Sequence, residues 1–244
     1  MTTSQATPIY RPLYEQIYDL LLDSLKLGEW KPGAMIPSEM ELAQRYRVSQ
    51  GTVRKAIDTM VQENLLRRQQ GRGTFVVSHE DMRSKLRFLR LTAASGQKEI
   101  LDHRLISCER QKADAEMSAW TGLPRGTRVI CIQRVLLFAH KPVILDDIIL
   151  EAKYFRGLNA LQIEAHHGSL YSLYAGEYGM SMVRAEEQIS AVAASVLQSE
   201  RLVIEVGYPL LKIVRTSYTY GDAPREWRTG YCVTAHHHYA NQLD

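Results

Sequence analysis

The chain has 244 residues, of which 45% are hydrophobic and 23% charged, and its formal net charge is +3. This length and composition fit two folded domains and exclude a disordered chain, and no apolar run approaches the ~20 residues that cross a bilayer. The N-terminus MTTSQATPIYR lacks the apolar centre of a signal peptide, and the three cysteines are scattered with no CxxC pair, so we expect a cytoplasmic protein with no membrane partner and no disulfide framework.

The first predicted element is a helix that begins after Pro12 and stops at Gly28. Its apolar residues recur at helical spacing and are expected to share one side: Leu13, Ile17, Leu20, Leu21 and Leu27.

Two further helices follow a turn-rich break at 31–37. Ser38 with Glu41 matches a capping box and begins a short second helix. Ser49 caps a third helix over 49–62, whose apolar residues Val53, Ile57 and Met60 lie on one side. The short turn between them predicts a helix-turn-helix unit.

The next segment predicts strands at 66–70 and 74–77 around a tight GRG turn, which completes a winged helix-turn-helix. We expect the polar edge of the 49–62 helix to enter a DNA major groove, where Gln50 and Arg54 reach base edges. Ser49 and Thr52 would hold phosphates, and Gly51 would allow close approach of the duplex. Arg72, at the hairpin tip, would meet a minor groove or a phosphate. Seven basic residues against two acidic ones over 45–74 support a polyanion partner.

The strings PLYEQI, PGAMIPSEMELAQRYRVSQGTVRKAI and ENLLRRQQGRGTFV resemble the GntR family of bacterial transcription regulators. The resemblance implies DNA-reading roles for Met40, Ser49, Gln50, Thr52, Arg54, Gln70 and Gly71, and the predicted DNA-binding set also includes Ser38, Gly51 and Arg72. Met40 and Gln50 stand where the family often has arginine. Because arginine binds guanine whereas glutamine prefers adenine, the operator is left open.

Beyond a charged segment at 78–87, which we expect to be a linker, the pattern changes to strands. Strands are expected at 127–138 and 141–150, followed by a hairpin around GDAP within 208–233, and helices at 112–121, 169–178 and 186–198. Hairpin-connected strands with separate helices indicate an α+β domain on an antiparallel sheet. The predicted organisation is therefore a DNA-binding domain at 1–77, a linker at 78–87 and a second domain at 88–244.

This second domain resembles the UTRA domain of HutC-like GntR regulators, whose fold is similar to chorismate lyase. The resemblance is carried by LPRGTRVICIQRVLL, KPVILDDIILEAKYF, GSLYSLYAGEYG and PLLKIVRTSYTYGDAPREWR. It implies a small, often anionic effector, a dimeric protein, and a pocket that includes Arg134, Asp146, Ser169, Tyr171 and Glu226.

The residues support part of this pocket. Arg134 lies on an otherwise apolar strand face, so its guanidinium needs either an anionic ligand or an internal carboxylate such as Asp146 or Glu226. Arg228 shares a strand face with Glu226, and we add it to the predicted effector site. Leu136 stands where sugar-phosphate sensors often carry a second arginine, which favours a carboxylate or less charged metabolite.

Three alternatives compete with a sensor, and one of them, a DNA scaffold protein without a ligand, is disfavoured by the internal Arg134. The HHH run at His236–His238 invites a metal site, but adjacent strand residues point to opposite faces, and we predict no metal and no cofactor. A lyase-like enzyme acting on a cyclic carboxylate is the main rival, although no nucleophile–base pair is evident and a fold does not imply a function. We therefore expect a non-enzymatic, ligand-responsive regulator, a repressor that binds double-stranded palindromic operator DNA as a homodimer.

Overall fold

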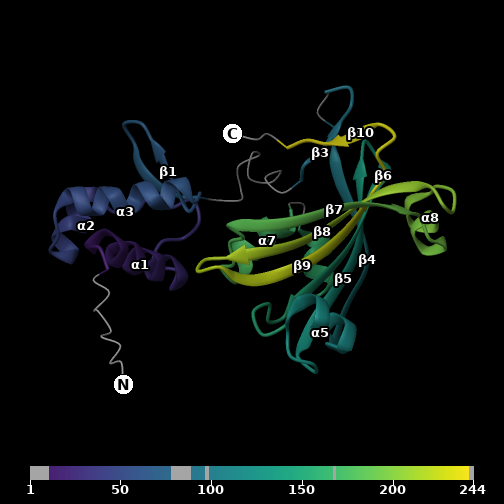
Figure 1. The fold of residues 1–244 in the computed structure, drawn as a ribbon, viewed down its shortest axis with the longest axis horizontal. Coiled ribbons are helices and arrows are strands. Elements are labelled where there is room, and N and C mark those ends of the chain that lie inside the picture. The colour runs from purple at the N-terminus through teal and green to yellow at the C-terminus, as the bar shows by residue number, and fades with distance from the viewer. Residues whose placement is uncertain (1–10, 78–88, 97–98, 167–168, 242–244) are drawn as a thin grey trace, which may run out of the picture. The chain divides into compact units, whose positions relative to one another are not determined.

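The computed structural model describes residues 11–77, 89–96, 99–166 and 169–241. The chain divides into two compact units, Met1–Ser78 and His79–Asp244 (Figure 1). The predicted linker at 78–87 lies outside the described residues. Every helix in the described part of the chain is too short or too polar to span a membrane.

The first unit combines helices with a two-stranded hairpin. Its described elements are α1 (Leu13–Lys26), α2 (Glu39–Tyr46), α3 (Gln50–Gln62), β1 (Leu66–Gln69) and β2 (Gly73–Val76). Helices α1 and α2 both pack against α3, which buries Val53, Ile57 and Met60. Strands β1 and β2 pair antiparallel. This is the winged helix-turn-helix that the sequence predicts.

The helix starts of this unit are as predicted, whereas the predicted face of α1 is partly wrong. Ser38 and Glu41 form the capping box of α2, and the Ser49 hydroxyl accepts the Thr52 amide at the start of α3. In α1 the buried stripe runs through Ile17, Leu21, Leu22 and Leu25. Leu13, Leu20 and Leu27 are exposed, because residues seven apart share one line along a helix and this line faces solvent.

The second unit is built on an antiparallel sheet. In the residues that the structure describes, six strands pair in the order β4-β5-β6-β9-β8-β7. They are β4 (Leu101–Lys112), β5 (Arg128–Phe138), β6 (Lys141–Glu151), β7 (Arg184–Ala193), β8 (Pro209–Thr219) and β9 (Ala223–Cys232). A separate pair joins β3 (Leu91–Ala93) to β10 (His237–Tyr239). The antiparallel α+β architecture is thus confirmed.

One face of the sheet carries two apolar cores with polar residues between them. Helices α6 (Ala160–Ala165) and α7 (Leu170–Tyr178) cover Ile130 and Ile132 of β5. Further along the same strand, β3 and β10 cover Leu136 and Phe138. Because side chains alternate along a strand, Arg134 lies on this same face, between the two cores.

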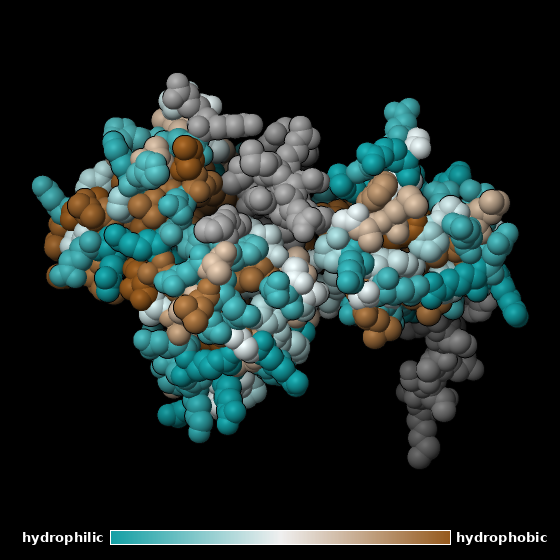
Figure 2. Space-filling model, turned by 180° about the vertical axis from the view of Figure 1, so that it is seen from behind, coloured by the Kyte–Doolittle hydropathy of each residue, from teal (hydrophilic) through white to brown (hydrophobic). Residues whose placement is uncertain are grey.

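The opposite face is covered by α5 (Ala115–Thr121) and α8 (Val196–Leu202). Apolar side chains stay exposed around α8 and the turn after it: Val196, Leu197, Val203 and Val206. Figure 2 shows hydrophobic groups scattered over this end of the unit. Val203, which ends α8, has a backbone φ of 57°, a left-handed conformation that is unusual for a β-branched residue.

The helix predicted at 186–198 is wrong. Residues 184–193 form the edge strand β7, which pairs with β8 along its whole length, and helix starts only at Val196. Hydrogen bonding to the open edge of β8 overrides the helix preference of an Ala- and Glu-containing segment. The helix predicted at 112–121 begins at Ala115, after an Asp114 cap, because β4 extends to Lys112.

Candidate functional site

The first turn of α3 presents polar groups to solvent. Gln50, Gly51 and Arg54 are exposed and Thr52 is half-buried. The Ser49 hydroxyl lies 2.8 Å from the Thr52 hydroxyl, besides accepting the Thr52 amide. A Cβ at Gly51 would meet only Ser49 Oγ, at 3.8 Å. The protein itself therefore does not require glycine here.

Glu39, which the sequence analysis missed, organises this edge from α2. Its carboxylate accepts Arg54 Nε at 2.9 Å, Arg68 Nη2 at 2.9 Å and the Gln50 amide at 3.4 Å. The second acidic contact of Arg68 is Asp58, at 2.9 Å. The side chain of Glu39 is only 19% exposed, whereas that of Arg54 is 56% exposed. Glu39 thus fixes Arg54 through its Nε atom and leaves more than half of the Arg54 side chain exposed to solvent.

The hairpin tip presents the remaining predicted DNA-binding residues. Gln70, Gly71 and Arg72 are exposed between β1 and β2, and Gly71 has a φ of 70°. Met40 is also exposed. Ser38 is exposed as well, but its hydroxyl donates to Glu41 at 2.7 Å, which ties it to the capping box.

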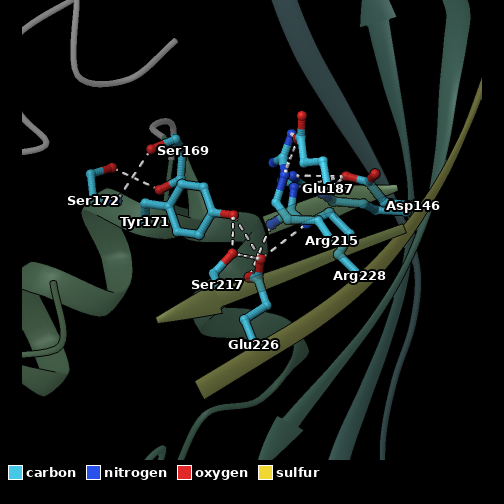
Figure 3. Close-up of polar contacts among 10 residues, drawn as sticks. Asp146, Ser169, Tyr171, Ser172, Glu187, Arg215, Ser217, Glu226 and Arg228 are labelled. Carbon is cyan, nitrogen blue, oxygen red and sulfur yellow. Dashed lines mark hydrogen bonds and ion pairs between the residues drawn. The ribbon is translucent and has the colours of Figure 1, made fainter. Parts of the chain in front are cut away.

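A buried cluster of charges crosses the sheet of the second unit (Figure 3). Arg134 donates to Asp146 Oδ2 through Nε at 3.2 Å and Nη2 at 3.0 Å. Arg228 donates to the same oxygen at 3.1 Å and grips Glu226 through two nitrogens, at 3.1 and 3.0 Å. Tyr171 donates its hydroxyl proton to Glu226 at 2.8 Å. Five of the six predicted effector residues therefore meet in one network.

The neighbouring strands extend this network with residues that sequence reasoning did not include. Arg215 of β8 lies beside Arg228 and donates to Glu187 of β7 at 2.6 Å. The Ser217 hydroxyl lies 3.1 Å from that of Tyr171. Tyr239 donates to Glu187 from β10, and burial together with this carboxylate raises the pKa of Tyr239 to about 12. The hydrogen bond from Tyr239 to Glu187 therefore connects β10 to the charge cluster.

Burial opposes the charge of both central arginines, but their pKa values shift in opposite directions. It lowers the pKa of Arg134 below its ordinary value, because Asp146 offsets only part of the lost hydration and Arg228 adds repulsion. Burial also opposes the charge of Arg228, but attraction from the carboxylates of Glu226 and Asp146 raises its pKa above the ordinary value. Arg228 is thus the better compensated of the two charges.

Ser169, the sixth predicted residue, does not join the network. It caps α7 by accepting the Ser172 amide at 3.2 Å, and its backbone oxygen accepts the Ser172 hydroxyl. Figure 3 shows this pair apart from the charges that Tyr171 reaches.

A pocket opens beside the charge cluster, on the side of β3. Asp146, Arg215 and Arg228 form its polar wall, together with Gly230. A Cβ at Gly230 would lie 3.2 Å from Asp146 Oδ1, so glycine at this position leaves room for that carboxylate. Arg90 lines the pocket from the segment that leads into β3, and the apolar lining is Leu89, Leu91, Leu136, Ile144, Ile213 and Cys232.

In the histidine run 236–238, His237 makes contacts within the second unit. His237 lies 2.8 Å from Glu99 and packs edge-on against Phe138, with ring centroids 5.0 Å apart. The described residues contain no group of three His, Cys, Asp or Glu side chains that could hold a metal ion.

Comparison with known proteins assigns both units. Residues 13–76 match the family model described as bacterial regulatory proteins, gntR family, and residues 97–238 match the UTRA domain. The chain belongs to the GntR family of bacterial regulators, in the group that carries a C-terminal UTRA domain.

Its relatives are transcriptional regulators. The chain is 30% identical to the HTH-type transcriptional repressor NagR of Bacillus subtilis over 232 residues, which cover 89% of this chain and 88% of NagR. It is 29% identical over 213 residues to a protein named "Probable fructoselysine utilization operon transcriptional repressor" in Escherichia coli K12, covering 87% and 86% of the two chains. The ligand-binding domain of a GntR-family regulator from Bordetella bronchiseptica superposes with a TM-score of 0.60 at 41% identity, over 64% of this chain and 96% of that domain.

Proposed function

We propose that this protein is a dimeric repressor whose affinity for a palindromic operator is controlled by a small anionic metabolite bound in the UTRA domain. The observation that carries the proposal is a pocket beside a buried charge cluster, in a unit distinct from the one that presents α3. The relatives named as repressors support the direction of control.

In this proposal the edge of α3 reads bases in the major groove. Gln50 and Arg54 contact base edges, while Ser49, Thr52 and the exposed N–H groups of the first turn bind phosphates. Gly51 lets the backbone approach the duplex. Gln70, Gly71 and Arg72 contact the neighbouring groove or its phosphates, and Ser38 supports α2 at the same edge.

The effector binds at the charge cluster and its pocket. Asp146 and Arg228 contact it directly, while Arg134, Tyr171 and Glu226 hold these groups in place, and Ser169 contributes through the start of α7. A ligand can alter DNA affinity only if it favours one arrangement of the DNA-binding units, since an equal fit to all arrangements shifts nothing.

The test selects operator duplexes from random DNA with the full-length protein and then measures their affinity by fluorescence polarisation across a metabolite library. The expected result is a palindromic operator and at least one metabolite that weakens its binding tenfold or more. A single asymmetric half-site, or an operator affinity that no metabolite changes, would contradict the proposal.

A further inference from the structure

The wall of the UTRA pocket is largely apolar. Leu89 and Leu91 lie on one side, and Leu136, Ile144 and Ile213 line the sheet. Burial raises the pKa of Cys232 well above its ordinary value, so this thiol stays neutral and adds to the apolar surface. This apolar part of the wall gains free energy by covering hydrocarbon and offers few hydrogen bonds to a polyhydroxylated ligand.

The charges around the pocket nearly cancel. Arg134, Arg215 and Arg228 face Asp146, Glu187 and Glu226 in ion pairs, so the cluster has no net charge. Arg90 is different. Its guanidinium donates to the neutral amide oxygen of Asn241, and no carboxylate pairs with it within the described ranges of the chain. Among the described residues, Arg90 is therefore the one pocket-lining cation without a carboxylate partner.

We infer that the effector is a monocarboxylate with a compact apolar body, and that Arg90 binds its carboxylate; this inference rests on the proposed function. A guanidinium offers a planar pair of N–H donors that matches a carboxylate. A phosphate monoester carries about −1.5 to −2 charges at pH 7, so one guanidinium would leave part of that charge buried without a partner, at a cost. Arg90 is thus the residue that sets specificity for a monoanion.

The test uses the full-length protein and a matched panel of probes. Phenylacetate, 3-methylbutanoate and indole-3-acetate are compared with their neutral amides and with glucose 6-phosphate, by calorimetry and by release of operator DNA. The expected result is that at least one acid binds ten times more tightly than its amide and releases DNA. Glucose 6-phosphate should bind more weakly than that acid.

Variants then locate the anion. Arg90→Gln should weaken the best acid at least tenfold and leave its amide unchanged, and Arg90→Lys should restore part of the loss. Arg104→Gln, which removes an exposed charge from β4, should change neither ligand.

Three outcomes overturn the inference: no acid binds, the phosphate ester binds more tightly than every acid, or Arg90→Gln binds the best acid as wild type does. If a phosphate ester or a neutral compound releases DNA instead, the proposed regulatory function stands and only the monocarboxylate inference fails. If no compound in the wider metabolite library alters DNA binding, the proposed function itself fails.

Discussion

The side chain of Arg54 projects from the first turns of α3, and one edge of its guanidinium is hydrogen-bonded to Glu39. We predict that Arg54→Ala costs about 1–3 kcal/mol of binding free energy on operator DNA and much less on random DNA, as a base contact should. Fluorescence polarisation with the two duplexes measures this difference. Arg72→Ala is the comparison, since a phosphate or groove contact at the hairpin tip loses affinity on both duplexes alike. Equal losses on both DNAs for Arg54→Ala would exclude base reading.

The sequence leaves open whether Arg134 pairs with an anionic ligand or with an internal carboxylate. In the structure, its guanidinium donates two hydrogen bonds to Asp146. We therefore expect Arg134→Ala to destabilise the protein by about 3–5 kcal/mol, because it breaks a buried ion pair.

Thermal and denaturant unfolding measure this loss, with Arg104→Ala on the neighbouring strand as the exposed control. Unchanged stability combined with lost effector binding would instead assign Arg134 directly to the ligand.

His103 lies partly buried on β4, on the side of the sheet that carries Arg134. Burial lowers its pKa, and the charge of Arg134 lowers it further. A histidine whose pKa is depressed in the folded state stabilises the fold above its unfolded pKa of ~6.5. That contribution is lost as the pH falls through the lower folded value. His103→Gln should therefore flatten the decline of melting temperature below pH 6.5. The exposed His236→Gln is the control, and an unchanged pH profile in His103→Gln would contradict this assignment.

At the scale of elements, α8 ends in a strained residue. Val203 caps it in the left-handed region, which costs a residue with a Cβ about 1–2 kcal/mol. We predict that Val203→Asn raises stability by about 1 kcal/mol, since asparagine tolerates this conformation. Val196→Asn removes a similar exposed valine from the other end of α8, where the backbone is unstrained, and should show no such gain in chemical denaturation. A loss of stability in Val203→Asn would mean that side-chain contacts outweigh backbone strain there.

Several elements were accessible from sequence because local signals and tertiary context agree. The β8–β9 hairpin follows from its GDAP turn, where Gly221 and Asp222 both have positive φ. Three residues, 220–222, connect the two strands, and a register shift between Ser217 and Tyr218 then places Arg215 opposite Arg228. The turn alone does not reveal this shift, so it could not place Arg215 in the predicted site. The capping box at Ser195 and Gln198 marks the true start of α8. The helix predicted at 186–198 extends across this capping box. The error arose because an edge strand of exposed residues lacks a clear alternating pattern.

Other parts of the site could not be read from the chain. Glu39 and Arg54 are fifteen residues apart on different helices, and only the angle between the helices makes them partners. Arg90 joins the pocket through the pairing of β3 with β10, across almost 150 residues of sequence. Contacts of this kind depend on packing that local propensity does not encode.

At the scale of the whole molecule, we predict a homodimer that places two winged units on two half-sites. The exposed edge of one α3 covers only a few base pairs, so operator specificity needs paired heads. Sedimentation should give a dimer at micromolar concentration, with and without DNA. Inserting five base pairs between half-sites should reduce affinity at least tenfold, because it turns one half-site by about half a helical turn. A monomer in both sedimentation runs would exclude this arrangement.

The position of Glu39 also bears on the thermodynamics of DNA binding. Each arginine that meets a phosphate ordinarily releases condensed counterions from the duplex, which makes affinity fall steeply with salt concentration. Arg54 and Arg68 already share Glu39 as an internal counterion, so DNA binding must compete with this carboxylate for them. DNA binding then partly exchanges one ion pair for another and does not simply form a new one. In the proposed binding mode, the protein would give up some electrostatic affinity for any duplex, and base contacts of Arg54 would account for a larger share of the preference for the operator.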